Sequence, residues 1–279
     1  MLAGFDHITI AVADLDSATL GYERLLGSAP IWRGRNPELG SASALFALSN
    51  AAVELVAPLA DDPAAEGLRA LLAARGEGLQ AIAFATVDAQ QTSAALRERG
   101  LRATPPQPGV SHGEGGRVRG YRTVELSTRA TRGLSVFAVE RPADGRLEPA
   151  SPPPAAAASA LDHVVIRTGD PDAAIELYEK GLGVRLALDR RLGERRMLFF
   201  RIGGVTIEVV HDPAANPHDM FYGAAYRVLD IDAAHARLAA AGFALNTVRD
   251  GNKQGTRVFS VRDGTSGVPT LILRDPARD

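Results

Sequence analysis

Two stretches of the chain decide its fold: FDHITIAVADLDSATLGYERLLG at residues 5–27 and LDHVVIRTGDPDAAIELYEKGLG at residues 161–183. They align without a gap at an offset of 156 residues, and 10 of their 23 positions are identical. Each stretch begins with alternating residue types, passes through Asp-x-Asp, and continues with helical spacing to Leu-Gly. The pattern predicts a strand, a turn and a helix in each copy, with an Asp at the helix start and a Gly at its end.

Fainter copies of the same strand–turn–helix pattern lie at residues 78–101 and 223–242. Each of the four helices is followed by strand-like runs, which lie at 43–48, 52–56, 121–126, 134–139, 197–202, 205–210, 256–261 and 269–273. The chain therefore contains four units, each with one strand, one helix and about three further strands. This order predicts an α+β fold in which helices cover one face of each sheet and the other face is left free to curve.

Composition excludes several classes of protein. The 279 residues include 31 Lys and Arg against 33 Asp and Glu, so the net charge of −2 argues against a basic nucleic-acid binder. Cysteine is absent, which excludes disulfides, thiolate-held metals and cysteine nucleophiles. No apolar run approaches the roughly 20 residues of a membrane span, and no signal peptide is evident. We expect a cytoplasmic protein with a small-molecule ligand and no nucleic-acid or membrane partner.

A Pro- and Ala-rich segment, residues 142–160, separates the two copies of the longer repeat. Three consecutive prolines oppose helix and sheet formation there, so the segment is predicted to be a linker. The first domain is then residues 1–141, with units at about 4–60 and 78–141. The second is residues 161–279, with units at about 161–213 and 220–276.

These motifs resemble the vicinal oxygen chelate superfamily, which includes glyoxalase I, methylmalonyl-CoA epimerase, bleomycin-resistance proteins and extradiol dioxygenases. The resemblance rests on the Asp-His start, the Asp-x-Asp turn, the Tyr-x-x-x-Leu-Gly helix end and a later strand with a central Glu. It implies an α+β fold of four βαβββ modules paired into two cup-shaped domains. It also implies a divalent metal held by the first and last strands of the modules.

Carried over to this chain, the resemblance implies metal ligands His7 and Glu54 in the first unit and His163 and Glu208 in the third. Imidazole and carboxylate groups suit zinc, iron, manganese or nickel. The matching positions of the second and fourth units hold Ala81, Phe137, Gly223 and Leu271, which cannot bind a metal. If neighbouring units pair, each cup has only two ligands, fewer than the three of a catalytic metal site.

Three interpretations of each His–Glu pair remain open: a weak metal site completed by substrate, a metal-free site, or a structural pair joining two strands. In the metal-free site, Glu54 or Glu208 is a general base, because a carboxyl on an apolar wall needs a partner or has a raised pKa. The sequence leaves open which units pair, whether a metal is bound, and whether the protein is a homodimer.

Three further residues are candidate substrate contacts. Arg167 shares a strand face with His163 and either clamps an anionic group or extends outward. Trp32 either lines a cup mouth or packs in the core. His112 lies in the Gly-rich stretch GVSHGEGGRVRG, which we expect to be a loop.

The combined prediction is a glyoxalase- or dioxygenase-like protein that acts on a small carbonyl or oxygen-rich metabolite, as a lyase, isomerase or dioxygenase. The incomplete ligand sets favour an alternative, a non-catalytic protein that binds or sequesters a small molecule, like the bleomycin-resistance proteins.

Overall fold

The computed structural model describes residues 1–142, 145, 148–149, 151–215 and 217–276. Eight strands and three α-helices precede residue 142 in the chain, and eight further strands and two α-helices follow residue 159. The strands of the first part are β1 Leu2–Ala11, β2 Trp32–Asn36, β3 Ser41–Ala47, β4 Ala52–Pro58, β5 Gly78–Thr86, β6 Gln107–Gly113, β7 Val118–Glu125 and β8 Ser135–Glu140. Its helices are α1 Leu15–Leu26, α2 Glu66–Arg75 and α3 Ala89–Glu98.

The second part repeats this order. Its strands are β9 Ala160–Thr168, β10 Arg185–Leu192, β11 Arg195–Ile202, β12 Val205–His211, β13 Met220–Arg227, β14 Arg249–Asp250, β15 Arg257–Val261 and β16 Thr270–Arg274. Its helices are α4 Pro171–Ile175, extended by the π-helical segment η5 Glu176–Gly181, and α5 Ile231–Ala240. Short 3-10 helices lie at Pro37–Leu39, Pro63–Ala65, Glu114–Gly116 and Pro213–Ala215. The predicted α+β class with two paired sets of modules is confirmed.

The predicted N-terminal helix caps form in both copies of the repeat, and the predicted glycine C-cap forms in the first. The side chain of Asp14 accepts a hydrogen bond from the backbone N–H of Ser17, and Asp170 does the same for Ala173. Gly27 ends α1 in the left-handed conformation, with φ of 78°, which glycine adopts without a steric penalty. The Asp-x-Asp turn thus sets where each helix begins. Gly27 caps α1 directly, whereas in the second copy the helical segment ends at Gly181 and Leu182 is its C-cap.

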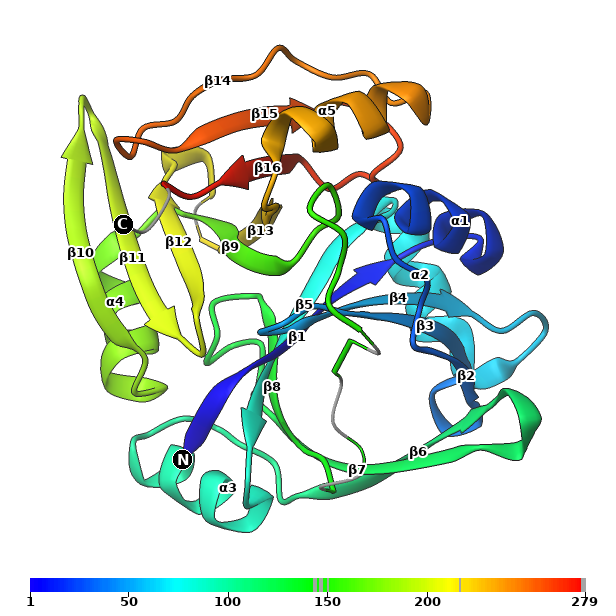
Figure 1. Cartoon of the computed structure of the whole chain (residues 1–279). Coiled ribbons are helices and arrows are strands. Elements are labelled where there is room, and N and C mark those ends of the chain that lie inside the picture. Colours follow the sequence, from blue (N-terminus) through cyan, green and yellow to red (C-terminus); the bar gives the residue numbers. More distant parts are fainter. Residues whose placement is uncertain (143–144, 146–147, 150, 216, 277–279) are drawn as a thin grey trace.

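Neighbouring units pair, which answers the question that the sequence left open. β1 runs antiparallel to β5 and parallel to β4, and in the second part β9 runs antiparallel to β13 and parallel to β12. The first and second units therefore share one sheet, and the third and fourth units share the other. Figure 1 shows the two sheets, each with helices on its outer face.

The two sheets close differently. In the first, β2 pairs with β6 through Gly34 and Gly113, so the eight strands form a closed barrel in the order β1-β4-β3-β2-β6-β7-β8-β5. The second has the order β10-β11-β12-β9-β13-β16-β15-β14 and stays open, with β10 and the two-residue β14 at its edges. Only the second sheet therefore keeps the open cup shape that the resemblance implies.

The alternation of each first strand decides which side chains enter the core. Ile8 and Ile10 are fully buried against the helices, while His7 and Thr9 face the barrel interior.

The two parts of the chain also contact each other directly: the buried side chain of Asp219 accepts hydrogen bonds from Arg132 and Thr168. Among the described residues, no helix has the length and apolar character of a membrane span.

Glycines make the barrel seam possible. A Cβ at Gly113 would lie 2.6 Å from the Cη2 atom of Trp32, whose buried indole cannot move aside easily. We expect Gly113→Ala to lower the free energy of unfolding by about 1–3 kcal/mol, the usual cost of overpacking. Chemical denaturation measures this. Gly120→Ala is the matched control, because a Cβ there meets nothing within 4 Å; equal losses in the two variants would contradict the prediction.

Candidate functional site

The first His–Glu pair lies inside the barrel and is held by two further charges. The Nδ1–H of His7 donates to Asp6 Oδ1 at 2.5 Å, and Arg141 donates to both carboxylate oxygens of Asp6. On the other side of the ring, His7 Nε2 lies 3.3 Å from Glu54 Oε2, yet it forms no aligned hydrogen bond. Arg141, Asp6, His7 and Glu54 thus form a chain of alternating charges.

The second pair repeats this arrangement on the concave face of the open sheet. The Nδ1–H of His163 donates to Asp162 Oδ2 at 2.8 Å, and Arg227 donates to Asp162 Oδ1 at 2.6 Å. His163 Nε2 lies 3.8 Å from Glu208 Oε2, beyond hydrogen-bond distance. The Asp-His dipeptide therefore builds the same chain twice, but the final contact to Glu is looser in the second copy.

The two glutamates differ in electrostatic state. Burial alone would lower the pKa of His7, but its hydrogen bond to Asp6 and the nearby charge of Glu54 raise it to about 9. Burial favours a raised pKa for Glu54, but the contact with His7 and the charge of Arg141 lower it. The first pair is therefore a fixed ion pair at neutral pH.

In the second pair, burial dominates. It raises the pKa of Glu208, and the charge of His163 offsets this only in part. The side chain of Glu208 is 16% exposed, so the carboxylate is desolvated and still reachable from the concave face. Its strand partners on β11 and β9 are Phe199 and Val165, which supply the apolar surroundings. A carboxyl with these properties is a better proton acceptor at neutral pH than Glu54.

Neither pair alone completes a catalytic metal site. In the barrel, the ring of Phe137 packs edge-on against His7, with 5.5 Å between ring centroids. Among the described residues, no group of three or more His, Cys, Asp or Glu side chains is placed to hold a metal. Two protein ligands per pair are fewer than the usual three of a catalytic site, and the ligand roles of His7, Glu54, His163 and Glu208 stay predictions.

We expect protein purified without a chelator to carry far less than one divalent metal per chain, because two ligands hold a metal weakly. Inductively coupled plasma mass spectrometry measures the content. The variant Glu54→Ala/Glu208→Ala is expected to carry the same small amount. A stoichiometric metal in the natural protein that disappears in the double variant would contradict this.

The three predicted substrate contacts lie in different surroundings. Arg167 is stacked over the Tyr222 ring at 3.8 Å, lies 3.6 Å from Asp212 and is about one-third exposed on the face that carries Glu208. Trp32 is buried in the barrel, and its Nε1–H donates to Ser111 Oγ. His112 is exposed on β6, so the expected loop is instead a strand. A structured hairpin therefore replaces most of the predicted loop, and only Arg167 lies on the face of the second pair.

Two basic residues that complete these sites, Arg141 and Arg227, carry no signal in the repeated motifs. Arg141 follows β8 and Arg227 ends β13, far along the chain from the Asp residues that they bind. Arg119 and Tyr121 of β7 face the barrel interior. The alternation of Val118–Glu125 was a usable signal for Arg119, because it places every second side chain on one face.

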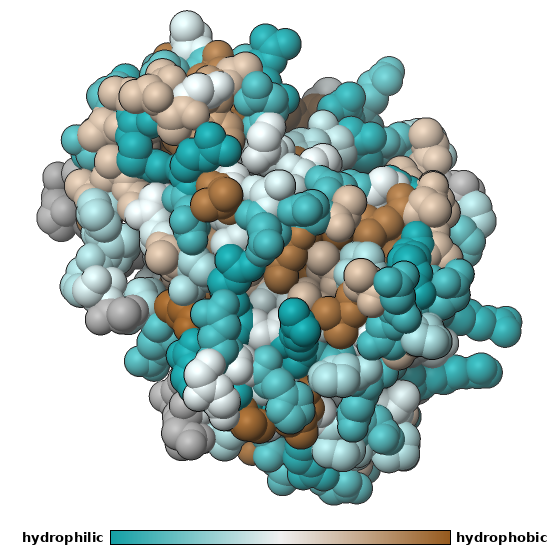
Figure 2. Space-filling view, turned by 90° about the vertical axis from the view of Figure 1, so that its right-hand side faces the viewer, coloured by the Kyte–Doolittle hydropathy of each residue, from teal (hydrophilic) through white to brown (hydrophobic). Residues whose placement is uncertain are grey.

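Two surface cavities lie apart from both His–Glu pairs. One of about 790 Å³ lies between α1 and the segment 261–269. The other, of about 620 Å³, lies outside the barrel between α1 and strands β2 and β3, and His112 lines it. Neither cavity is lined by His7, Glu54, His163 or Glu208. Figure 2 shows one side of the molecule as mostly hydrophilic, with separate small hydrophobic spots.

Comparison with known proteins places the chain in a family. Residues 5–157 match the model of the glyoxalase-like domain, and residues 160–272 match that of the glyoxalase, bleomycin resistance protein and dioxygenase superfamily. The chain belongs to this vicinal oxygen chelate superfamily, as the repeated motifs predicted. No curated protein matches the sequence significantly.

Two solved structures align with nearly the whole chain. A variant of 4-hydroxymandelate synthase from Streptomyces coelicolor has 18% identity and a TM-score of 0.75, over 100% of this chain and 95% of the other. The Mn(II)-bound glyoxalase from Novosphingobium aromaticivorans has 16% identity and a TM-score of 0.69, over 99% and 83%. Methylmalonyl-CoA epimerase from Mycobacterium tuberculosis is 28% identical over 51% of this chain and 91% of its own, with a TM-score of 0.44. At sequence identities of 18% and 16%, the two full-length alignments establish a shared fold.

Proposed function

We propose that this protein is an enzyme of the vicinal oxygen chelate type that removes a proton next to a carbonyl group of a small metabolite, with Glu208 as general base. One observation carries this: the Glu208 carboxylate is desolvated, forms no hydrogen bond among the described residues, and is still reachable on the concave face of the second sheet. Glu54, the equivalent carboxylate, is held by His7 and is the weaker base.

His163 lies beside this base and is the proposed contact for the carbonyl oxygen of the substrate. Its Nδ1–H donates to Asp162, which fixes the orientation of the ring and leaves Nε2 available for a hydrogen bond with that oxygen. Glu208 then takes the proton from the adjacent carbon, and the electron pair of the broken C–H bond moves onto that oxygen. The separation of 3.8 Å between Nε2 and Glu208 leaves both groups free to contact substrate.

Arg167 is the proposed anchor for a negatively charged group of the substrate. It shares its strand face with His163, and stacking on Tyr222 fixes the guanidinium plane. In this proposal the substrate domain is residues 161–279, separated by the linker 142–160 from the domain of residues 1–141. Parts of that linker lie outside the described residues.

The test uses small carbonyl compounds with an exchangeable C–H: pyruvate, phenylpyruvate and acetoacetate in D₂O. We expect the protein to accelerate the loss of the proton next to the carbonyl, followed by ¹H NMR, both with and without a chelator. Loss of exchange on chelation would favour the metal-dependent interpretation of the same residues. Binding by saturation transfer without accelerated exchange of any of the three would contradict the proposal and favour the sequestration alternative.

A further inference from the structure

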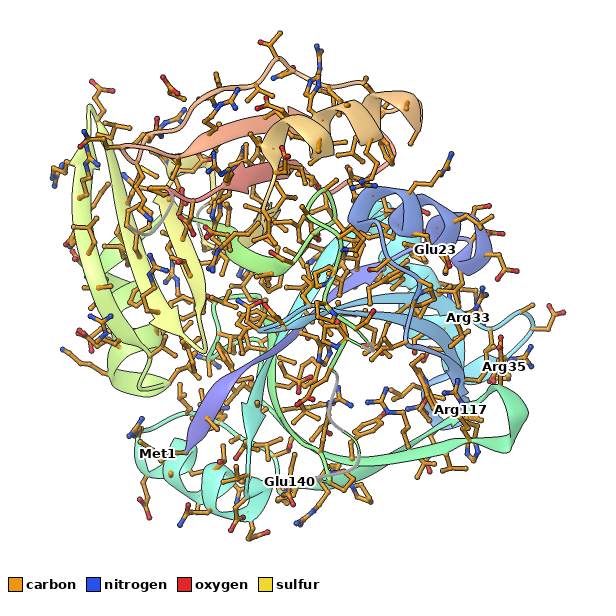
Figure 3. The ribbon with its side chains drawn as sticks, in the orientation of Figure 1. Met1, Glu23, Arg33, Arg35, Arg117 and Glu140 are labelled. Atoms are coloured by element: carbon orange, nitrogen blue, oxygen red, sulfur yellow. The ribbon has the colours of Figure 1, made fainter. Side chains whose placement is uncertain are left out.

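The interior of the first barrel contains a positive charge that the proposed chemistry does not use. Strand β7 turns Arg119 and Tyr121 inward, while Val118 and Arg122 lie on the outer face. The guanidinium of Arg119 lies 5.0 Å from the Trp32 ring, and that of Arg117 lies 5.1 Å from it. Figure 3 shows Arg117 on the side of the barrel where β2 meets β6, with Arg33 and Arg35 nearby.

The surrounding glycines make room for these aromatic side chains. A Cβ at Gly34 would lie 2.6 Å from Trp32 Nε1, and a Cβ at Gly109 would lie 2.3 Å from the Tyr121 ring. The Tyr121 hydroxyl accepts a hydrogen bond from Asn36 at 2.7 Å. Trp32 and Tyr121 are therefore fixed in the barrel wall, and Trp32 in turn positions Arg119.

The other charges in the barrel have partners. Arg141 donates hydrogen bonds to Asp6 from both Nε and Nη2 of its guanidinium group, and His7 lies between Asp6 and Glu54. Arg119 donates to the carbonyl oxygen of Gly145 at 2.9 Å, a neutral acceptor, and none of the ion pairs among the described residues includes it. Among the described residues of the barrel, three positive groups thus face two carboxylates, namely Arg119, Arg141 and His7 against Asp6 and Glu54.

The uncompensated charge has an energetic consequence. Burial and the positive charge of Arg141 lower the pKa of Arg119 to about 10, below the usual arginine value. Placing a guanidinium where its charge is disfavoured costs free energy, which an anionic ligand would recover.

The barrel geometry limits the ligand. β4 and β7 stand four places apart in the ring of eight strands, so Glu54 and Arg119 lie on opposite walls. An eight-stranded barrel has an interior that side chains fill or that holds one small ligand. A ligand bound to Arg119 must therefore be small.

We propose that the first barrel binds a small organic carboxylate on Arg119, at a site separate from Glu208. The planar guanidinium matches a carboxylate through two parallel hydrogen bonds, which are stronger than its present bond to a neutral carbonyl. The carboxylate takes the place of the Gly145 oxygen and balances the charge of the barrel. Binding involves no chemical step.

The test is isothermal titration calorimetry on the full chain with benzoate and with benzamide, its neutral counterpart of the same shape. We expect the natural protein to bind benzoate at least about 10-fold more tightly, because hydrogen bonds to a charged group are stronger than those between neutral groups. Arg119→Gln removes this preference. Arg122→Gln, the matched control on the outer face of the same strand, retains it.

The proposal is overturned if the natural protein binds benzoate and benzamide with equal affinity, or if Arg119→Gln keeps the preference for benzoate. It is also overturned if Arg122→Gln loses this preference to the same extent as Arg119→Gln. So would a failure of acetate, benzoate and phenylacetate all to bind. If Arg119→Gln does not fold, Arg119→Lys keeps the charge and is expected to reduce the preference. Glu208→Gln is expected to leave benzoate binding unchanged, so the test does not depend on the proposed proton transfer.

Discussion

Glu208→Gln is expected to lower the rate of proton exchange next to the carbonyl by about 100- to 10,000-fold, the usual contribution of a general base. Glutamine keeps the size and the hydrogen-bonding capacity of the side chain, but it cannot accept the proton. Because Glu208 forms no hydrogen bond with any residue that the structure describes, we expect the fold to persist when its charge is removed.

Glu54→Gln is the matched control for this prediction, since it makes the same change at the equivalent position of the other sheet. We expect its exchange rate to stay within about 10-fold of the natural protein, less than the effect of losing a general base. The ¹H NMR exchange assay measures both variants. A large loss in Glu54→Gln with normal exchange in Glu208→Gln would move the catalytic site to the first barrel.

Asp6→Asn is expected to lower the free energy of unfolding by about 3–5 kcal/mol, because it removes one partner of a buried ion-pair network. Asp6 is about one-tenth exposed and faces both Arg141 and the imidazolium of His7, so the substitution removes the counter-charge of the buried Arg141 and leaves His7 with Glu54 alone. Urea denaturation at neutral pH measures the change.

The control is Asp16→Asn, which breaks an exposed pair with Arg33 and is expected to cost no more than about 1 kcal/mol. The pH dependence adds a second check. His7 and Arg141 hold the pKa of Asp6 well below its usual range against the opposing effect of burial. The stabilisation is therefore complete above the usual aspartate pKa of about 4 and is lost as the pH falls below it. If the free energies of unfolding of the natural protein and Asp6→Asn differ by the same amount down to strongly acidic pH, this prediction is contradicted.

Much of the fold could be predicted from the repeated stretch alone. The residues that are identical in the two copies mark equivalent positions in both parts of the chain. The capping residues of the repeat predict where the helices begin and end. The first strand after each helix was missed, namely β2, β6, β10 and β14. Sequences such as WRGRN and QPGVSHG lack the apolar alternation of a strand, because their strand character comes from pairing with neighbours. The closure of the first sheet depends on the pairing of two of these strands, β2 and β6, so it could not be foreseen.

The candidate site was predictable in its residue types but not in its electrostatics. Asp-His and the later Glu appear in both copies, and the structure brings each His close to its Glu. The difference between Glu54 and Glu208 depends on a small change in distance to the imidazole and on local burial. Arg141 and Arg227 reach their Asp partners from positions that are not equivalent in the repeat. Only the folded chain shows these contacts.

The repeated motif has two electrostatic states in this protein, a fixed ion pair in the barrel and a free base in the open sheet. Site-specific titration by ¹³C NMR of the two glutamate carboxyls, assigned with Glu54→Gln and Glu208→Gln, measures this difference at the two side chains themselves. We predict that the pKa of Glu208 lies above the ordinary glutamate value and that of Glu54 below it. A Glu208 pKa at or below the ordinary value, or one lower than that of Glu54, would contradict the account.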